Sequence, residues 1–199
     1  MQEKRLVLAS GSPRRKELLA GLGLSFEVIV SDVDETIEPG IDPREVVQAL
    51  AYRKAKAVAN SLSHGLVIGA DTIVVCDGLI LGKPVDEEDA KRMLSKLSGR
   101  AHMVYTGVAF VEAGGGREAL DVRGTEVCMK ELSPELIARY VATGDPMDKA
   151  GAYGIQGAAA TFIPEIHGDY FNVVGLPVSL VADHLIEFGY QIFATPQGR

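Results

Sequence analysis

The sequence predicts an α/β protein whose sheet is mixed rather than purely parallel. Segments with helical periodicity alternate along the chain with β-prone apolar segments, which is the order typical of α/β folds. Asp77-Gly78 is a strong hairpin signal between two apolar runs, so at least one pair of strands is antiparallel. The chain contains no internal repeat and no low-complexity linker that would separate two domains.

Helix starts are marked by capping side chains. Ser12-Pro13, Asp42-Pro43 and Ser133-Pro134 each place a side-chain acceptor before a proline that suits the first helical position, and Asp86 can cap in the same way. Together with glycines at their ends and Gly175-Leu176-Pro177 before the last one, these signals predict helices over residues 13–22, 43–61, 87–98, 134–143 and 178–188.

The strands follow from short, β-prone apolar runs. We expect them at residues 5–9, 26–30, 67–76, 79–81, 102–111 and 120–130, with a further hairpin of 161–166 and 170–174 around His167-Gly168-Asp169. Residues 145–160 read as a long glycine-punctuated loop, and such loops are usually functional or disordered. Its Tyr153 and Ile155 argue against disorder, whereas the tail after Phe193 is expected to fray.

The composition excludes several classes of protein. With 47% hydrophobic and 24% charged residues the chain can bury an ordinary core, and its net charge of -7 argues against a general nucleic-acid binder. The apolar run near the N-terminus is too short for a signal peptide and no later run reaches membrane-spanning length, so the expected location is the cytoplasm. Cys76 and Cys128 have no Cys-x-x-Cys partner and are expected to be reduced thiols.

One carboxylate lies in the middle of the most β-prone run. Asp71 interrupts the apolar stretch 67–75, and an ionised side chain is costly there unless something pairs with it. Perturbed acids occur both in structural ion pairs and in active sites. On the run alone, Asp71 is equally well explained as a structural acid or as a catalytic one.

A basic segment between a strand and a helix start predicts an anion site. Ser10, Ser12 and the small Gly11 let an anion approach the free N–H groups of the helix start, and Arg14 and Arg15 can bind phosphate oxygens in a fork. The alternative is a solvated charge run, but cations oppose the helix dipole at this end. This local misfit favours a functional role.

Two lysines are further candidates for binding an anion. Lys54 falls on the apolar stripe of the 43–61 helix, where it either extends along its stem to solvent or points at a ligand. Lys83 belongs to Gly82-Lys83-Pro84, which fails as a P-loop because Asp77 and Pro84 stand where glycine and Ser or Thr are required. A surface turn is the ordinary reading of Lys83.

Carboxylates near these cations could hold a metal ion. Asp32, Asp34 and Glu35 form an acidic loop that, with Asp71, offers oxygen ligands for Mg²⁺, although most acidic loops are simply solvated. The four histidines lack zinc spacing, and no Gly-x-Ser-x-Gly elbow supports nucleophilic catalysis. Cations for a polyphosphate together with carboxylates for a metal and a base suggest phosphoanhydride hydrolysis or nucleotidyl transfer.

Five motifs stand in order along nearly the whole chain, from about residue 6 to 188. They are Ser10-Gly11-Ser12-Pro13-Arg14-Arg15, Gly69-Ala70-Asp71-Thr72, Gly82-Lys83-Pro84, Leu97-Ser98-Gly99 with His102 and Thr106-Gly107, and Asp148-Lys149-Ala150-Gly151-Ala152-Tyr153-Gly154-Ile155-Gln156-Gly157. This set resembles the Maf family of nucleoside triphosphate pyrophosphatases, which are akin in fold to the inosine triphosphate pyrophosphatases. The last motif is long and highly specific.

The resemblance implies a fold and an activity. The expected fold is one Maf-like domain over residues 1–193, a mixed twisted sheet flanked by helices with two lobes around a deep cleft. The implied reaction converts a nucleoside triphosphate to the monophosphate and pyrophosphate with a divalent metal, Mg²⁺ or alternatively Mn²⁺. The resemblance also allows a homodimer and links the family to inhibition of septum formation. It implies no nucleic-acid or membrane partner.

The resemblance also implies roles for particular residues. Asp71 corresponds to the family's proton acceptor. Beside the resemblance, our own hypothesis is that Glu35 binds the metal ion, with Asp71 as a further candidate ligand. The residues attributed to specificity correspond to Arg14, Thr72 and Gln156, a pattern that looks like the branch acting on dTTP and UTP rather than on 7-methyl-GTP. The complete set expected to bind the substrate is Ser12, Arg14, Arg15, Lys54, Thr72, Lys83 and Gln156.

Two other functions fit parts of the same pattern. A nucleotidyltransferase could open with a similar strand, Ser-Gly-x-x-Arg-Arg loop and helix, and it would release pyrophosphate only with an acceptor. A nucleotide-sensing regulator of division would bind dTTP without consuming it. One geometric question also stays open, because Asp71 and Thr72 face opposite sides of a regular strand, unless Gly69 marks a bulge or Thr72 acts through its backbone.

Overall fold

The computed structural model describes residues 4–36 and 40–193. Among these the strands are β1 (Leu6–Leu8), β2 (Glu27–Val28), β3 (Leu66–Cys76), β4 (Leu79–Leu81), β5 (Ala101–Glu112), β6 (Glu118–Cys128) and β7 (Glu165–His167). The α-helices are α1 (Pro13–Ala20), α2 (Pro43–Ala59), α3 (Glu87–Leu97), α4 (Pro134–Val141), α5 (Tyr170–Val174) and α6 (Val178–Glu187). Short 3₁₀ helices are η1 (Asp145–Asp148), η2 (Ala150–Ala152) and η3 (Gly157–Phe162).

The sheet is mixed, as the sequence predicts. Its order is β2-β1-β3-β5-β6-β7, with β4 paired to β3 off this path. Strand β1 is parallel to β2 and β3, whereas β4 is antiparallel to β3 and β7 is antiparallel to β6. The predicted mixed α/β class is therefore confirmed.

The chain forms two compact units. The first contains the described residues up to Asp71, Gly107–Val122 and the residues from Gly175 on, and the second contains Thr72–Thr106 and Arg123–Val174. Strand β3 thus begins in the first unit and ends in the second. The two units fit the expected two lobes, while the single domain over 1–193 and the deep cleft stay predictions.

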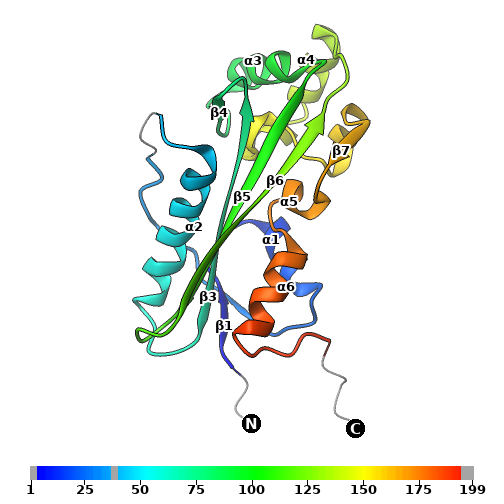
Figure 1. The fold of residues 1–199 in the computed structure, drawn as a ribbon. Coiled ribbons are helices and arrows are strands. Elements are labelled where there is room, and N and C mark those ends of the chain that lie inside the picture. The colour runs from blue at the N-terminus through cyan, green and yellow to red at the C-terminus, as the bar shows by residue number, and fades with distance from the viewer. Residues whose placement is uncertain (1–3, 37–39, 194–199) are drawn as a thin grey trace. The chain divides into compact units, whose positions relative to one another are not determined.

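The first unit is layered, with helix α2 on one face of β1 and β3 and helix α6 on the other (Figure 1). Alternate side chains of the strands serve the two faces. Val7 and Val67 are fully buried in the cluster that includes α2, whereas Leu8 and Ile68 are fully buried in the cluster that includes α1 and α6. This alternation decides which way every later residue of β3 points.

Two glycines let α2 lie directly on the sheet. A Cβ atom at Gly69 would stand 2.2 Å from the carbonyl oxygen of Ala51, and one at Gly107 would stand 2.4 Å from that of Val47. No side chain can be added at either position without moving the helix. Gly69 therefore allows α2 to pack closely against β3. The strand is continuous through this residue, so no bulge is needed to explain the glycine.

The second unit has its own core. Helices α3 and α4 and the 3₁₀ segments pack together, and all residues of this core lie within the second unit. Helix α3 contributes Ala90, Met93, Leu94 and Leu97 to this core, which lie on one face at helical spacing.

Two sequence-based expectations for residues 145–174 were wrong. The expected loop 145–160 contains three 3₁₀ turns, because the glycine-rich chain closes short i→i+3 bonds. The expected second hairpin strand is instead helix α5, since the Asp169 carboxylate accepts the backbone N–H groups of Phe171 and Asn172 and caps a helical turn. Within residues 145–174, which the structure describes throughout, only Glu165–His167 forms a strand, and it pairs with β6.

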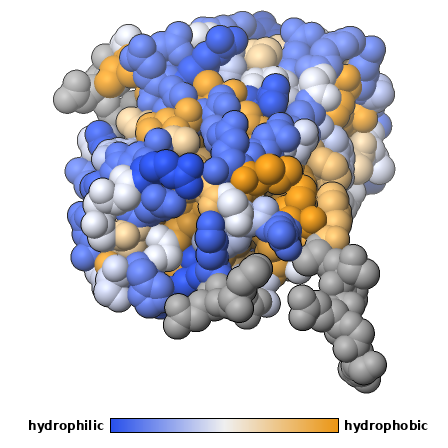
Figure 2. Space-filling view, turned by 60° about the horizontal axis from the view of Figure 1, so that its bottom comes forward, coloured by the Kyte–Doolittle hydropathy of each residue, from blue (hydrophilic) through white to orange (hydrophobic). Residues whose placement is uncertain are grey.

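Other bounds agree closely with the expectations, although β2 is only two residues long. The expected fraying after Phe193 concerns residues 194–199, which lie outside the described part of the chain. Among the described residues no helix is long and apolar enough to cross a bilayer. The face drawn in Figure 2 is mostly hydrophilic, with smaller hydrophobic areas between the polar side chains, as on most globular proteins.

Candidate active site

Asp71 is held by a lysine from α2. Because Val67, Gly69 and Asp71 share one face of β3, the carboxylate points toward the helix that covers that face. Lys54 Nζ donates a hydrogen bond of 2.6 Å to Asp71 Oδ1, and both side chains are only 12% exposed. The helical spacing predicts that Lys54 faces inward with the apolar residues of α2. Its ion pair with Asp71 explains why a lysine occupies this position.

The same ammonium group also binds a second carboxylate. Glu35 Oε1 lies 2.8 Å from Lys54 Nζ, and the Glu35 side chain is 59% exposed. The acidic loop and the β3 acid therefore converge on one point. Asp34 is used differently, because its carboxylate accepts hydrogen bonds from the Thr36 hydroxyl and from the Thr36 backbone N–H, and these two bonds lower its pKa.

The basic segment is built around Arg15. Ser12 caps α1 by accepting the backbone N–H of Arg15. The Arg15 guanidinium donates to the Gly175 carbonyl at 2.8 Å and to Ser10 Oγ at 3.2 Å. These bonds fix the guanidinium plane, which is half-buried rather than free to follow solvent.

Charges of both signs surround Arg15. Burial lowers the pKa of its guanidinium, the Asp71 carboxylate raises it, and Arg14 and Glu35 act with smaller effects in opposite directions. All four groups belong to the first unit. Asp71, Lys54, Glu35, Arg14 and Arg15 therefore form one electrostatic cluster in the first unit.

Glu35 and Asp71 suit a hard divalent cation. Both offer carboxylate oxygens, and both approach the same Nζ atom, so a small cation beside Lys54 could reach an oxygen of each. Mg²⁺ typically takes one or two carboxylates and completes its shell with water and substrate phosphates. The residues present therefore fit a magnesium ion.

Thr72 points to the other side of β3 from Asp71. Its hydroxyl lies 2.9 Å from Thr106 Oγ1, and Thr106 in turn donates to the Asn172 carbonyl at 2.9 Å. Asn172 is fully buried and donates to Val104 and Thr125. Thr72 is thus fixed by a polar network of the second unit. Asp71 and Thr72 point to opposite faces of β3, as consecutive residues of a regular strand do.

Lys83 and Gln156 are exposed and belong to the second unit. The turn that holds Lys83 is tied to the long motif, because Gly151 N–H donates to the Gly82 carbonyl at 3.0 Å. Gly151 has φ 70° and a Cβ there would stand 3.0 Å from Val74 of β3, so the backbone packs where no side chain fits.

The long motif is stiffened from inside. Ala152 is fully buried with φ 61°, a left-handed conformation that costs energy in a non-glycine residue and that persists where the surroundings impose it. Next to it, Tyr153 shares a 2.6 Å hydrogen bond with Nε2 of the buried His102. Lys149 Nζ binds the carboxylates of Asp145 and Asp148. Gln156 thus follows a rigid segment.

The motifs and their geometry agree with a known family. The family model described as "Maf-like protein" matches residues 5–188, which is nearly the whole chain. The chain belongs to the Maf family. The resemblance stated from the sequence motifs is therefore confirmed.

Relatives of this Maf-like chain match over nearly their full length. A protein of Desulforamulus reducens named "dTTP/UTP pyrophosphatase" is 54% identical over 94% of this chain and 98% of its own length. A protein of Moorella thermoacetica with the same name is 53% identical over 95% of this chain and 97% of its own.

Solved structures support the fold. The Ham1 protein of Staphylococcus aureus covers 93% of this chain and all of its own with a TM-score of 0.55, and that of Coxiella burnetii covers 92% and 99% with a TM-score of 0.53. Their sequences are 15% and 16% identical to this chain, so these two matches show similarity of fold alone.

Some polar contacts near the candidate residues do not follow from the sequence. Ser10 belongs to the basic motif, and its hydroxyl is buried and accepts a hydrogen bond from the Arg15 guanidinium. Thr106 and Tyr153 lie in two of the quoted motifs, but their partners Thr72, Asn172 and His102 are far away in the sequence. The partners of Lys149 are the nearby Asp145 and Asp148. The position of a polar residue in an apolar run signals burial, whereas its partner follows only from tertiary structure.

Proposed function

We propose that this Maf-family chain hydrolyses dTTP and UTP to the nucleoside monophosphate and pyrophosphate. The observation that carries the proposal is near-full-length identity of about one half to proteins named dTTP/UTP pyrophosphatase. The cluster of Asp71, Lys54, Glu35, Arg14 and Arg15 supplies the chemistry such a reaction needs, namely a base, cations and carboxylates for a metal.

Asp71 is the proposed proton acceptor. Its carboxylate would take a proton from a water molecule whose oxygen forms a bond to the α-phosphorus while the bond from that phosphorus to the bridging oxygen breaks. The electron pair leaves with pyrophosphate. Lys54 holds the carboxylate in a fixed rotamer through the 2.6 Å hydrogen bond, so the base is positioned before substrate binds.

The cations would neutralise the triphosphate. We assign this role to Arg14, Arg15, Lys54 and Lys83, with Ser12 at the helix start that favours an anion. When bound, a divalent ion, Mg²⁺ with Mn²⁺ as the alternative, adds positive charge beside the phosphates, and Glu35 and Asp71 would hold it. Removing it with a chelator is therefore expected to stop turnover.

Specificity for the base is assigned to Arg14, Thr72 and Gln156 by the resemblance. Gln156 offers both a donor and an acceptor, which suits the edge of uracil or thymine. The hydroxyl network behind Thr72 fixes its side chain, which supports a role in selecting the base.

The setting of the reaction is also proposed. A net charge of -7 favours a small anion held by a local cluster over nucleic acid, and we propose that the protein acts on free nucleotides in the cytoplasm, without a membrane partner. A homodimer is the expected assembly, and sedimentation velocity tests it.

A nucleotide panel tests the function against its two rivals. The protein is incubated with Mg²⁺ and each of dTTP, UTP, CTP, GTP and 7-methyl-GTP, and the products are separated. We expect monophosphate plus pyrophosphate, fastest with dTTP and UTP. Turnover that requires a sugar phosphate would indicate a nucleotidyltransferase, and tight binding of dTTP without products would indicate a sensor. Preferential cleavage of 7-methyl-GTP would contradict the pyrimidine assignment.

A substitution tests the base. Asp71→Asn keeps the shape of the side chain but removes its proton affinity, so kcat is expected to fall by about 10²–10⁴-fold with nucleotide binding largely kept. Asp77→Asn is the matched control, because Asp77 forms surface ion pairs with Lys96 and Arg100. Pyrophosphate release at the parental rate by Asp71→Asn would overturn the assignment.

A further inference from the structure

Strands β6 and β7 bring four metal-binding side chains to one face. In their antiparallel register Glu126 is opposite His167 and Cys128 is opposite Glu165. Residues two apart in a strand share a face, and directly opposite residues share it as well. The four side chains therefore form two neighbouring cross-strand pairs.

This face is the outer one. The residues between the two pairs are Val127, which is fully buried, and Ile166, and both pack into the core of the second unit. The side chains that would bind the ion are accessible: 46% of Glu126, 56% of His167 and 61% of Glu165 is exposed. Cys128 is half-buried. An ion can therefore reach the cluster from solvent.

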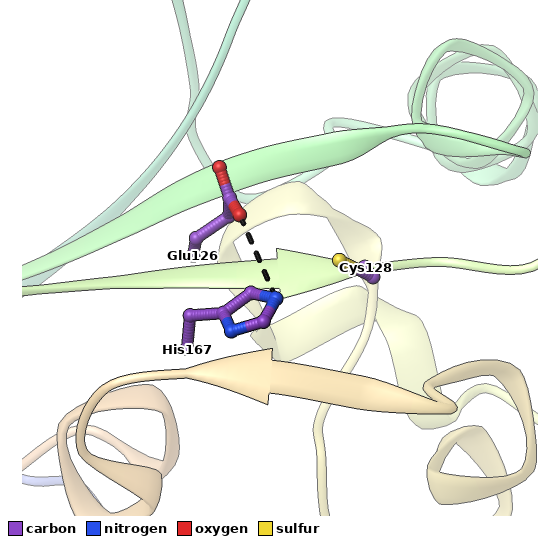
Figure 3. A group of neighbouring side chains, drawn as sticks. All are labelled: Glu126, Cys128 and His167. Carbon is purple, nitrogen blue, oxygen red and sulfur yellow. Dashed lines mark ion pairs between the residues drawn. The ribbon is translucent and has the colours of Figure 1, made fainter.

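The ligand atoms are already close. The carboxylate, thiol and imidazole atoms of Glu126, Cys128 and His167 lie within 4.8 Å of one another, and His167 Nε2 is 4.0 Å from Glu126 Oε1 (Figure 3). The same nitrogen is 3.5 Å from Glu165 Oε1. Bonds of about 2.0–2.3 Å in a tetrahedral site place ligand atoms roughly 3.3–3.7 Å apart, so small side-chain rotations bring the set to that spacing.

We propose that Glu126, Cys128 and His167, with Glu165 as a fourth ligand, form a site for a borderline divalent ion, Zn²⁺ above all. The set of one thiolate, one imidazole and carboxylates is the ligand chemistry that Zn²⁺ accepts and that Mg²⁺ does not favour. It shares no residue with the Glu35 and Asp71 pair, so the proposal is independent of the catalytic one.

Metal binding by this cluster would hold the edge strand β7 to its neighbour β6. Strand β7 is three residues long and ends the sheet order among the described strands. It leads from η3 into α5, whose Asn172 carbonyl accepts from Thr106. Ligands contributed by both strands hold β7 to β6, so the ion is expected to stabilise the second unit.

Cobalt titration of the full chain tests the site. Co²⁺ bound by a thiolate gives a ligand-to-metal charge-transfer band in the near ultraviolet, and Co²⁺ bound by carboxylates alone does not. We expect one equivalent of Co²⁺ to produce the band, Zn²⁺ to remove it, and excess Mg²⁺ to leave it unchanged. Zn²⁺ is also expected to raise the Tm of the parental chain.

Matched variants locate the site. Cys128→Ser is expected to lose the band and His167→Gln to weaken Co²⁺ binding at least tenfold, whereas Cys76→Ser keeps both the band and the affinity because Cys76 is buried elsewhere. Both ligand variants change accessible side chains, and circular dichroism checks that they fold. Absence of the band in the parental chain, or its persistence in Cys128→Ser, would overturn the proposal.

Discussion

Lys54 joins the two carboxylates on which the catalytic proposal depends. Its Nζ lies 2.6 Å from Asp71 Oδ1 and 2.8 Å from Glu35 Oε1. A lysine so placed has two effects, since it orients the base and adds positive charge where phosphates are expected. Both effects are expected to increase the rate of the reaction, in addition to any contribution of the ion pair to the stability of the fold.

Replacing this lysine tests its part in the reaction. Lys54→Gln keeps much of the stem but removes the charge, so kcat/KM for dTTP is expected to fall by about 10²-fold. Lys56→Gln is the matched control on the same helix, because Lys56 forms a more exposed pair with Glu118 and such pairs contribute about 0–1 kcal/mol. Equal kinetics of the two variants would contradict the role of Lys54.

His102 is a buried histidine that stays neutral in the folded chain. Burial lowers its pKa from 6.5 to about 4. The unfolded chain therefore binds a proton at this residue between pH 6.5 and 4 that the folded chain does not bind, so the free energy of unfolding falls as the pH falls through this window. At 1.36 kcal/mol per pKa unit the loss amounts to about 3 kcal/mol.

This loss is specific to the imidazole. His102→Gln keeps a hydrogen-bonding group for Tyr153 but does not titrate, so its free energy of unfolding is expected to fall less between pH 6.5 and 4 than that of the parental chain. Urea unfolding at several pH values measures the difference. Parallel pH profiles would show that His102 is not the group responsible.

At the scale of elements, helix α2 and strand β3 form the frame of the site. The helix backbone lies on Gly69, where a Cβ would stand 2.2 Å from the Ala51 carbonyl oxygen and 2.8 Å from the Ala55 nitrogen. This contact sets the height of Lys54 over Asp71. Close packing therefore determines the geometry of the ion pair.

A single methyl group tests this frame. Gly69→Ala is expected to push α2 away from β3, to lower the free energy of unfolding by about 1–3 kcal/mol, and to reduce activity through the displaced Lys54. Gly82→Ala is the stability control, since nothing lies within 4 Å of its added Cβ. Thermal unfolding measures both variants, and an unchanged Tm for Gly69→Ala would contradict the packing argument.

The elements show what local sequence can predict. Helices that begin at Pro13, Pro43 and Pro134 follow from caps whose side-chain acceptors lie within three residues. Helical spacing predicts that Lys54 faces inward, and strand alternation predicts which face Asp71 shares with its neighbours. That the two side chains form an ion pair follows only from the tertiary structure. Helix α5 was missed because the β-prone Val173-Val174 is overridden by the Asp169 cap and by the burial of Asn172.

At the scale of the whole molecule, the proposed machinery is divided along the chain. The base and its charged partners belong to the first unit, whereas Thr72, Lys83 and Gln156 belong to the second. The family resemblance assigned both groups to one reaction, which periodicity and spacing could not do. Strand β3 connects them directly, because Asp71 and Thr72 are consecutive residues.

In the proposed reaction a water molecule attacks the α-phosphorus of the nucleotide. Hydrolysis of dTTP with Mg²⁺ in ¹⁸O-labelled water, followed by mass spectrometry of both products, tests this point of attack directly. We expect the label in the nucleoside monophosphate and none in the pyrophosphate. Label in the pyrophosphate, or products that form only with an added acceptor, would contradict it.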